Sequence, residues 1–442
     1  MKRYSLCVML STLLCSGLSA LDTQQFYRSG FVHAVPRQVP NQPTASLEVR
    51  LGSGSAHRSF GPHERKTGLF NAHGPFDVVR LGQNLQDLTS KPVTARYWGA
   101  AGRPFDDLST LQPGDGLVEV SGNFHTTTVD IALKQTLFSG FYAEALVPCS
   151  ELKVHGVSLK NIGSGTVKGV PMNTTFLNTD LPAILAENGL QGLSGVTRDM
   201  GVADPILSLG WEGFAKRVAA EVSEARGYLQ VGVSLPAASG KDHHQIFDVP
   251  RGYNGHVGFL GRGAAEACLW GVITVGVQAG VHNFLHLNRD VRLKTDKAQN
   301  GWILLEQARV KEDLGSLWDV GGYLSLNNAI KGVRALVGYH FTRQEETRYQ
   351  VRDANYLKTY IAQQALNNVF ISKDDFANSD TRLNAWEAHV MQLALRFDSS
   401  ELVQTAWSVQ AAIEYNYPLF GRNAWVTPMV GGTLGASLSF NF

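Results

Sequence analysis

Apolar and polar residues alternate along many stretches of this 442-residue chain. In residues 228–235 the odd positions are Leu or Val, and the even positions are Tyr, Gln, Gly and Ser. Similar alternation occurs in residues 333–341, 391–397 and 407–417. A period of two is the pattern of a β-strand that has one apolar and one polar face.

Residues 267–287 contain no Asp, Glu, Lys or Arg, and their number would suit a membrane-spanning helix. Their parity indicates otherwise, because Ile273, Val275 and Val277 alternate with Thr274, Gly276 and Gln278. The content of Val, Ile, Thr and Gly also favours a strand.

We expect about twelve strands in all. They are placed at residues 45–52, 117–136, 140–160, 201–215, 226–238, 254–265, 268–283, 317–327, 331–346, 384–397, 404–416 and 431–442. Every second connection is then short: residues 138–139, 216–225, a turn near Glu266, 327–332 and 398–403. An even strand number with alternating short and long connections is typical of outer-membrane barrels. A soluble sandwich also buries one face of each strand, but the polar faces here are mostly small and uncharged.

The predicted fold class is therefore all-β, a transmembrane antiparallel up-and-down β-barrel of about 12 strands (12–14), with short helices in the outer loops. Such barrels carry aromatic residues at the two membrane interfaces. The candidates for these girdles are Tyr228, Tyr339, Trp407, Tyr415 and Tyr417.

The N-terminus has the layout of a secretory signal peptide. Lys2 and Arg3 precede an apolar run, and small residues follow it up to Ala20, after which we expect cleavage. We therefore divide the chain into a signal peptide at 1–20 and a single barrel at 21–442, with long extracellular loops near 53–116, 161–200, 284–316 and 347–383.

Two of these loops contain helical patterns. In the loop near 161–200, Thr179 or Asp180 can cap a short helix and Gly189 can end it. In the loop near 347–383, the apolar spacing of residues 354–370 predicts a helix of about three turns. Helices in barrel loops can enter the lumen or cover its mouth, or lie on the surface without a gating role.

Composition narrows the function classes. Lys plus Arg number 39 and Asp plus Glu 38, so the net charge of +1 gives no sign of a nucleic-acid partner. Charged residues are only 17% of the chain, which suits strands that face lipid. After removal of the signal, Cys149 and Cys268 remain; this is not a disulfide scaffold, and we favour no bond between them.

The last residues alternate as well, with Leu438, Phe440 and Phe442 on one side of the predicted strand. Together with the signal peptide and the alternating strands, this ending resembles the closing strand of Gram-negative outer-membrane β-barrel proteins. The resemblance implies the cell outer membrane as location, and outer-membrane lipid and the barrel-assembly machinery as partners. Ser437 departs from the Gly that is common in this pattern.

A narrower resemblance rests on three Gly-rich segments, "GVADPILSLGW", "VGVSLPAASGKD" and "RGYNGHVGFLG". They are similar in layout to segments of porin-like transporters for fatty acids and aromatic hydrocarbons. Because many barrels share such segments, no functional residue is carried over from them.

No catalytic or metal motif stands out. The segment "GSGSA" at 52–56 lacks the order and setting of a lipase nucleophile motif. His282 and His286 have the spacing of a helical metal site, but on a strand they lie about 13 Å apart. We expect no enzyme activity, no cofactor and no metal.

Five charged residues fall on predicted inward positions. They are Glu48, Arg50, Arg334, Arg396 and Glu414. A charge there needs water or a partner, so these residues either line a selective pore or form structural ion pairs that fill a narrow barrel.

A barrel of this size lies between filled eight-stranded barrels and open porins. The first hypothesis is a porin-like channel for passive uptake of small-molecule solutes, hydrophobic ones included. The alternative is a surface or adhesion protein whose barrel anchors large outer loops. An outer-membrane hydrolase and a soluble periplasmic protein are further hypotheses.

Overall fold

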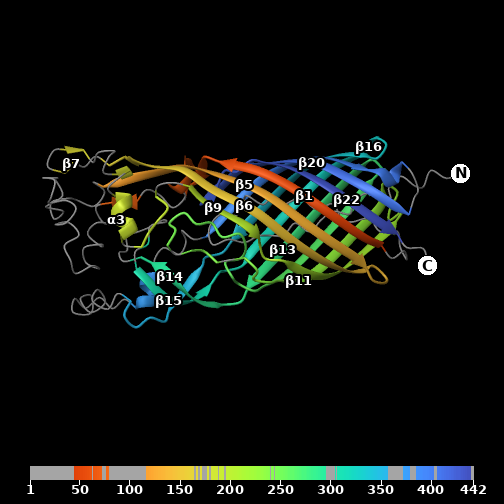
Figure 1. The fold of residues 1–442 in the computed structure, drawn as a ribbon. Coiled ribbons are helices and arrows are strands. Elements are labelled where there is room, and N and C mark those ends of the chain that lie inside the picture. The colour runs from red at the N-terminus through yellow and green to blue at the C-terminus, as the bar shows by residue number, and fades with distance from the viewer. Residues whose placement is uncertain are drawn as a thin grey trace.

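In the computed structural model, twelve antiparallel strands form a sheet that closes on itself into a barrel (Figure 1). The structure describes residues 44–439, except 62, 72–75, 79–115, 164–165, 168–169, 172–176, 179–180, 188, 194–195, 239, 243, 295–303, 305, 357–371, 379–384 and 403–405. The expected signal peptide, the helix at 354–370, the helix caps Thr179 and Asp180, and the terminal Phe440 and Phe442 lie outside the described residues.

The barrel strands follow one another around the wall in chain order. They are β1 (Thr44–Ala56), β5 (Leu117–Thr136), β6 (Phe141–Asn161), β10 (Ile206–Lys216), β11 (Val222–Ser234), β12 (Gly258–Leu269), β13 (Ile273–Phe284), β16 (Leu317–Ile330), β17 (Val333–Gln344), β19 (Trp386–Asp398), β20 (Trp407–Arg422) and β22 (Met429–Ser439). The first strand closes the barrel, because Glu48 of β1 lies opposite Ala132 of β5 and opposite Gly435 of β22. The prediction of an up-and-down barrel of about twelve strands is confirmed.

Five short turns lie at the end of the barrel where β1 begins and β22 ends (Figure 1). They comprise residues 137–140, 217–221, 270–272, 331–332 and 399–406. In outer-membrane barrels this end faces the periplasm. The first of these turns requires glycine at position 140. The φ of Gly140 is +84°, and a Cβ atom added there would lie 2.2 Å from the carbonyl oxygen of Glu212. The expected turn near Glu266 was wrong, because β12 and β13 stay paired as far as Leu269 and Ile273.

The strand after β6 contains a β-bulge. β9 (Val196–Val202) and β10 both pair with β6, with Val202 opposite Cys149 and Ile206 opposite Leu146. Between these two pairs, β6 advances by three residues and the other strand by four. One extra residue reverses the side-chain parity, so even positions point outward in β9 and odd positions in β10.

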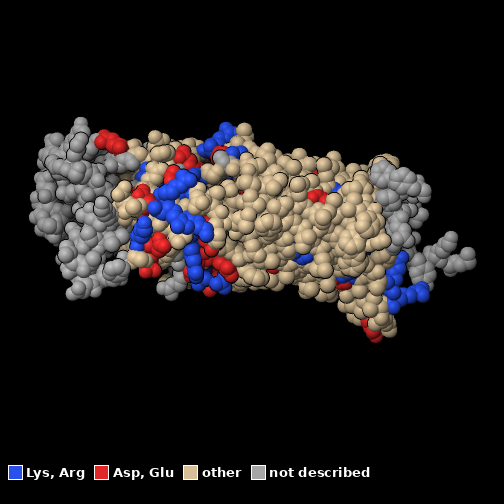
Figure 2. Space-filling view, turned by 90° about the horizontal axis from the view of Figure 1, so that it is seen from below, with Lys and Arg blue, Asp and Glu red and all other residues tan. Residues whose placement is uncertain are grey.

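The outer surface of the barrel has a wide apolar band. Leu, Val and Ile side chains that point outward from the strands are exposed throughout it, for example Leu51, Leu209, Val231, Leu395 and Leu434. Figure 2 shows this band almost free of charged residues, with charges gathered toward the extracellular end and a few at the opposite end. A band of this kind is stable in lipid and would expose a large apolar area in water.

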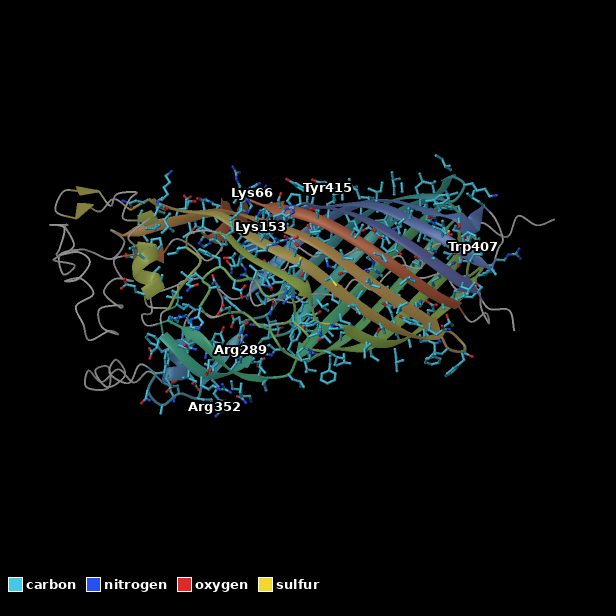
Figure 3. The ribbon with its side chains drawn as sticks, viewed as in Figure 1. Lys66, Lys153, Arg289, Arg352, Trp407 and Tyr415 are labelled. Atoms are coloured by element: carbon cyan, nitrogen blue, oxygen red, sulfur yellow. The ribbon has the colours of Figure 1, made fainter. Side chains whose placement is uncertain are left out.

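Aromatic residues mark the edges of the band. Trp407 is 60% exposed near the periplasmic end, and Tyr415 lies farther toward the extracellular end (Figure 3). Tyr339 is also exposed on the outside, and Tyr417 is partly exposed. Tyr228 was a wrong assignment, since it faces the interior with 5% exposure. Its even position on β11 gives it the inward parity of its neighbours Arg226 and Gln230.

The extracellular mouth contains a buried apolar core, which we name the outer core. It joins inward residues at the strand ends to residues from the connections between strands. The connections contribute residues from β2 (Arg58–Phe60), β21 (Ala424–Trp425), the 3₁₀ helix η1 (Leu69–Asn71), α3 (Leu181–Glu187) and the loop between β11 and β12. α3 ends as expected, because Gly189 adopts a φ of +74° and the amide of Leu190 donates to the carbonyl of Leu185.

A small sheet lies outside the barrel at the extracellular end. It consists of β14 (Leu287–Leu293), β15 (Glu306–Asp313) and β18 (Arg348–Val351), and α5 (Lys373–Ala377) packs on it. Shorter pairs are β2 with β3 (Lys66–Gly68), β4 (Phe76–Asp77) with β5, and β7 (Thr166–Val167) with β8 (Val170–Pro171); a 3₁₀ helix, η5 (Ser399–Glu401), follows β19. Among the described residues, no helix is long and apolar enough to cross a membrane.

Candidate functional site

The lumen within the apolar band is lined by charged and polar side chains. Because successive strand residues point to opposite faces, the positions between the lipid-facing residues all point inward. The inward charged residues that the structure describes within the twelve barrel strands are Glu48, Asp130, Glu144, Glu212, Glu224, Glu266, Asp319, Asp398, Glu414, Arg50, Lys134, Arg226, Arg262, Arg334 and Arg396. Nine are acidic and six are basic, so acidic residues are in excess by three.

All five charged residues predicted from the sequence lie buried in one sector of the wall, on β1, β17, β19 and β20. Arg50 forms an ion pair with Glu48 two residues before it on β1. Arg396 lies 3.4 Å from Glu414 across the β19–β20 pair, and Arg334 lies opposite Arg396 in the β17–β19 register. The structure thus brings these residues together, and Gln392 Nε2 also donates to Glu414 at 3.1 Å.

The other sector carries charges that the sequence analysis did not select. Lys134 Nζ lies 2.9 Å from Glu212, and Arg226 pairs with Glu224 and lies 3.6 Å from Glu266. Tyr323 donates its hydroxyl to Glu266 at 2.6 Å. In these strands, as in β19 and β20, the alternation of apolar and polar residues shows which positions point inward. These charged residues could therefore have been found by applying the alternation rule to every strand.

Several inward carboxylates have oxygen atoms with no protein hydrogen-bond partner. Among the residues that the structure describes, this is true of Asp130 Oδ1, Glu144 Oε1 and Asp319 Oδ1. A buried polar atom without a partner is costly, and in proteins such atoms are usually satisfied by water. These three oxygens are buried among neighbouring side chains, and water or ions that enter the barrel at the level of the apolar band would satisfy them.

The outer core lies above this polar lumen. The rings of Phe70 and Phe247 have centroids 4.1 Å apart, and those of Phe124 and Trp425 are 4.5 Å apart. Phe124 is an inward residue of β5, whereas the other three come from connections between strands. The core thus fastens three connections to the inside of the wall.

The connection at residues 235–257, between β11 and β12, is held by polar contacts as well. We name it the plug loop. Asp204, which the β-bulge turns inward, accepts hydrogen bonds from the backbone amides of Ala237, Ala238 and Tyr253. In addition, Arg251 Nε donates to Asp199 at 2.6 Å. These contacts tie the beginning and the end of the plug loop to β9 and β10.

The far end of the plug loop is attached to the extracellular sheet. His256 Nε2 lies 2.9 Å from Glu312 on β15, and Arg289 on β14 lies 2.7 Å from the same carboxylate. Burial of the imidazole would lower the pKa of His256, but the hydrogen bond to Glu312 and the charge of that carboxylate outweigh it, so the pKa is raised. The pKa of Glu312 is lowered. Burial of the carboxylate would raise this pKa, but the neighbouring Arg289 and the hydrogen bond and charge of His256 outweigh burial.

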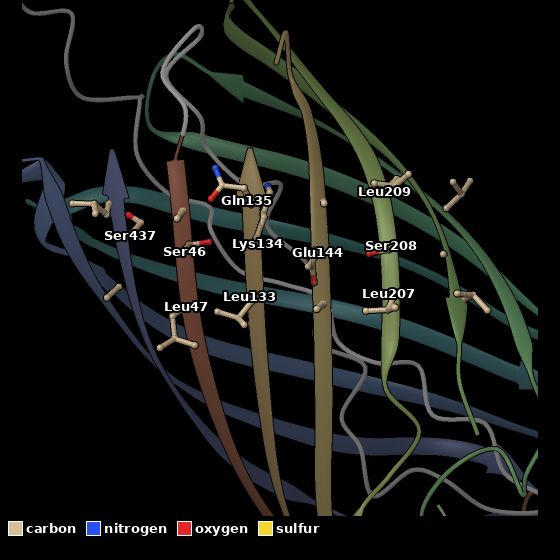
Figure 4. Close-up of a pocket in the computed structure, with 18 of the residues that line it drawn as sticks. Ser46, Leu47, Leu133, Lys134, Gln135, Glu144, Leu207, Ser208, Leu209 and Ser437 are labelled. Carbon is tan, nitrogen blue, oxygen red and sulfur yellow. The ribbon is translucent and has the colours of Figure 1, made fainter. Parts of the chain in front are cut away.

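A groove of about 1090 Å³ lies on the outer face of the wall, across strands β22, β1, β5, β6, β10 and β11 (Figure 4). Exposed Leu47, Leu133, Leu207 and Leu209 border it, with small residues such as Ala145 between them. Because these positions face lipid, the groove belongs to the membrane side of the wall and is open to acyl chains.

The described residues contain no group of three or more His, Cys, Asp or Glu that could hold a metal ion. Cys149 and Cys268 are not bonded to each other. Ser234 Oγ and His282 Nε2 are 3.1 Å apart, but both side chains are buried and Tyr253 packs edge-on against the imidazole. This pair stabilises the junction of β11, β13 and the plug loop.

A closed barrel with a charged interior, an apolar outer band and aromatic edges is the architecture of proteins that span the outer membrane. This chain is an outer-membrane β-barrel protein. The hypothesis of a soluble periplasmic protein was therefore wrong.

No family model and no curated protein matches the chain. Solved structures with a similar fold include an outer membrane channel from Pseudomonas putida F1, with 10% identity, 91% of this chain and 97% of that chain covered, and a TM-score of 0.45. A FadL homologue from Pseudomonas aeruginosa has 8% identity, 91% coverage of both chains and a TM-score of 0.30. The CymD monoaromatic hydrocarbon channel has 9% identity, 92% and 90% coverage, and a TM-score of 0.28. Likeness at this level concerns the barrel fold and assigns no function.

Proposed function

We propose that this barrel is a passive channel for small solutes. The observation that carries the proposal is the set of inward carboxylate oxygens without protein partners, at Asp130 on β5, Glu144 on β6 and Asp319 on β16, inside the apolar band. Water that solvates these groups forms a polar path through the hydrophobic thickness of the membrane. A barrel that only anchors outer loops has no need of such a path, because side chains can fill a lumen of this size.

The outer core is the closed gate of this channel. Its residues at the mouth are aromatic and aliphatic, among them Phe70, Phe124, Phe247 and Trp425. A solute that passes through the mouth meets these side chains, so apolar or aromatic small molecules are favoured over strongly hydrated ones. The polar lumen below then gives the solute a route toward the periplasm.

The charges of the lumen predict a preference among ions. Nine acidic against six basic inward residues leave an excess of negative charge, which attracts cations and repels anions. Replacing Arg396 by Glu would increase this excess at a position where Arg396 lies 3.4 Å from Glu414.

Single-channel recording in a planar bilayer tests the proposal. We expect current steps from the folded barrel and a higher cation-to-anion permeability ratio for Arg396→Glu. Arg309→Glu is a matched control, since Arg309 is exposed on the extracellular sheet and should leave the ratio unchanged. A folded barrel that stays silent even when the outer core is loosened would reject the channel.

The outer core also favours a second candidate, a surface protein whose barrel anchors the extracellular segments. In that case the plugged mouth is permanent, and binding resides in segments such as the β14–β15–β18 sheet. Persistent silence in the bilayer, together with adhesion that survives charge reversal in the lumen, would support this candidate.

A further inference from the structure

Basic side chains gather on the outer face of β5, β6 and β9 and directly after the end of β1, on the extracellular side of the apolar band. We name this group the basic row. It consists of His57, His125, Lys153, His155 and Arg198. Strand register makes its members neighbours, because Lys153 lies opposite His125 on one side and opposite Arg198 on the other. His57 and His155 are linked through Asn123, which lies opposite His155 and has its Oδ1 2.5 Å from His57 Nδ1.

The basic row lies directly beyond the lipid-facing surface. On β6 the outward residues run from Val147 and Cys149 through Glu151 to Lys153. At about 3.3 Å per residue, Lys153 is roughly 13 Å along the strand from Cys149. Figure 3 shows Lys153 farther from the periplasmic end than Tyr415, at the level of Lys66. We take this level, just beyond the exposed apolar residues of the wall, as that of the lipid headgroups.

Little acidic charge opposes the row. Glu151 is 2.7 Å from Arg198, and the Arg198 side chain remains 57% exposed in this pair. Lys153 has no ion pair or hydrogen bond within the part of the chain that the structure describes. Exposed arginines of the extracellular region likewise have acidic neighbours, as Arg309 has Asp290 and Arg348 has Glu346, so Lys153 is the member that distinguishes the basic row.

We propose that the basic row binds the phosphate groups of an anionic lipid in the outer leaflet. Lys offers a compact positive charge to phosphate, Arg offers paired N–H donors, and the His rings offer further N–H donors. A lipid fits better than a soluble anion, because Leu51, Val129 and Val202 extend below the row and can contact acyl chains while the headgroup meets Lys153. Each Lys or Arg at such a surface strengthens the attraction to anionic lipid.

Binding of diphosphorylated lipid A to the full-length barrel in a neutral detergent tests this inference, with native mass spectrometry as the readout. We expect retention of diphosphorylated lipid A, weaker retention of the monophosphorylated form, and least retention of phosphatidylcholine. Lys153→Gln combined with Arg198→Gln should weaken apparent affinity for the diphosphorylated lipid about 10- to 30-fold. Raised salt should weaken it as well.

The matched control is Arg309→Gln combined with Arg348→Gln, which removes two exposed arginines elsewhere and should retain the lipid as the unmodified protein does. Heat-modifiable gel migration reports whether each variant is folded, and the single Lys153→Gln variant replaces the double variant if that one does not fold. Equal retention of all three lipids, or unchanged affinity in the folded Lys153 variant, would overturn the inference. Competition by inorganic phosphate at equal concentration would show a soluble-anion site instead and would overturn it too.

Discussion

Replacing Asp204 by Ala should release the plug loop while the barrel remains closed. The side chain of Asp204 accepts hydrogen bonds from the amides of Ala237 and Ala238, at 2.9 Å each, and from the amide of Tyr253. Asp204 is 2% exposed, so water does not replace these acceptors in the closed loop. Hydrogen bonds to a charged group contribute about 1.5–3 kcal/mol each, although neighbouring contributions are not additive. We expect a loss of about 3–6 kcal/mol in the attachment of the loop.

A change of this size raises the population of the detached loop by roughly two to four orders of magnitude. Hydrogen–deuterium exchange followed by mass spectrometry measures it directly: amides of residues 237–253 should exchange faster, whereas those of β16 and β17 should not. In planar bilayers the same variant should show more frequent or larger current steps. Asp204→Asn keeps one acceptor oxygen and should give an intermediate result.

Asp290→Ala is the matched control, because Asp290 belongs to an exposed pair with Arg309 that is worth about 0–1 kcal/mol. It should leave exchange in the plug loop unchanged. If residues 237–253 stay as protected in Asp204→Ala as in the unmodified protein, the loop is held by the outer core alone. The role that we assign to Asp204 in the attachment of the plug loop would then be wrong.

Three further predictions concern other parts of the barrel. His256 has a raised pKa, so the stability that its charged form gives is present below the ordinary histidine pKa and is lost as pH rises through the folded value. The protection factors of the plug-loop amides, which are exchange rates corrected for base-catalysed intrinsic exchange, should therefore fall from pH 6 to pH 9, and His256→Gln should remove this fall. Leu395→Arg places a charge on the lipid face and should destabilise the barrel by about 2–4 kcal/mol in urea unfolding from lipid vesicles, whereas Leu395→Ile should not. Deletion of Phe442 should leave less heat-modifiable, closed barrel in the outer membrane, and unchanged migration would contradict an assembly role.

The barrel could be predicted from the sequence because the alternation within each strand depends only on the residues of that strand. Each strand must alternate between lipid and lumen, so residues such as Leu395 and Arg396 indicate their own side without knowledge of any partner. All twelve expected strands overlap those of the structure. The five inward charges were found by the same rule, and the inward charges of β5, β6, β11 and β12 were missed only because the rule was applied to fewer strands.

The mouth could not be predicted in this way. Phe70 and Phe247 pack together although 177 residues separate them, and no periodicity in their segments indicates a common partner. Asp204 in "GVADPILSLGW" precedes Pro205, which suggests an interruption of the strand but not the direction of the carboxylate. That direction depends on one extra residue in the pairing with β6, which is a property of two strands together.

The β-bulge between β9 and β10 also divides this part of the wall into two segments whose lipid-facing positions have opposite parity. On the periplasmic side of the bulge, Leu207 and Leu209 face lipid at odd positions. On its extracellular side, Met200 and Val202 face lipid at even positions. If this segment paired with β6 without the extra residue, one of the two sets of side chains would turn to the wrong face. Removal of one residue at Ala203 would instead give both sets the same parity, so that a regular strand without the bulge would keep both of them on the lipid face. The β-bulge and the length of this short segment are therefore coupled, and natural variation must keep or change the two together.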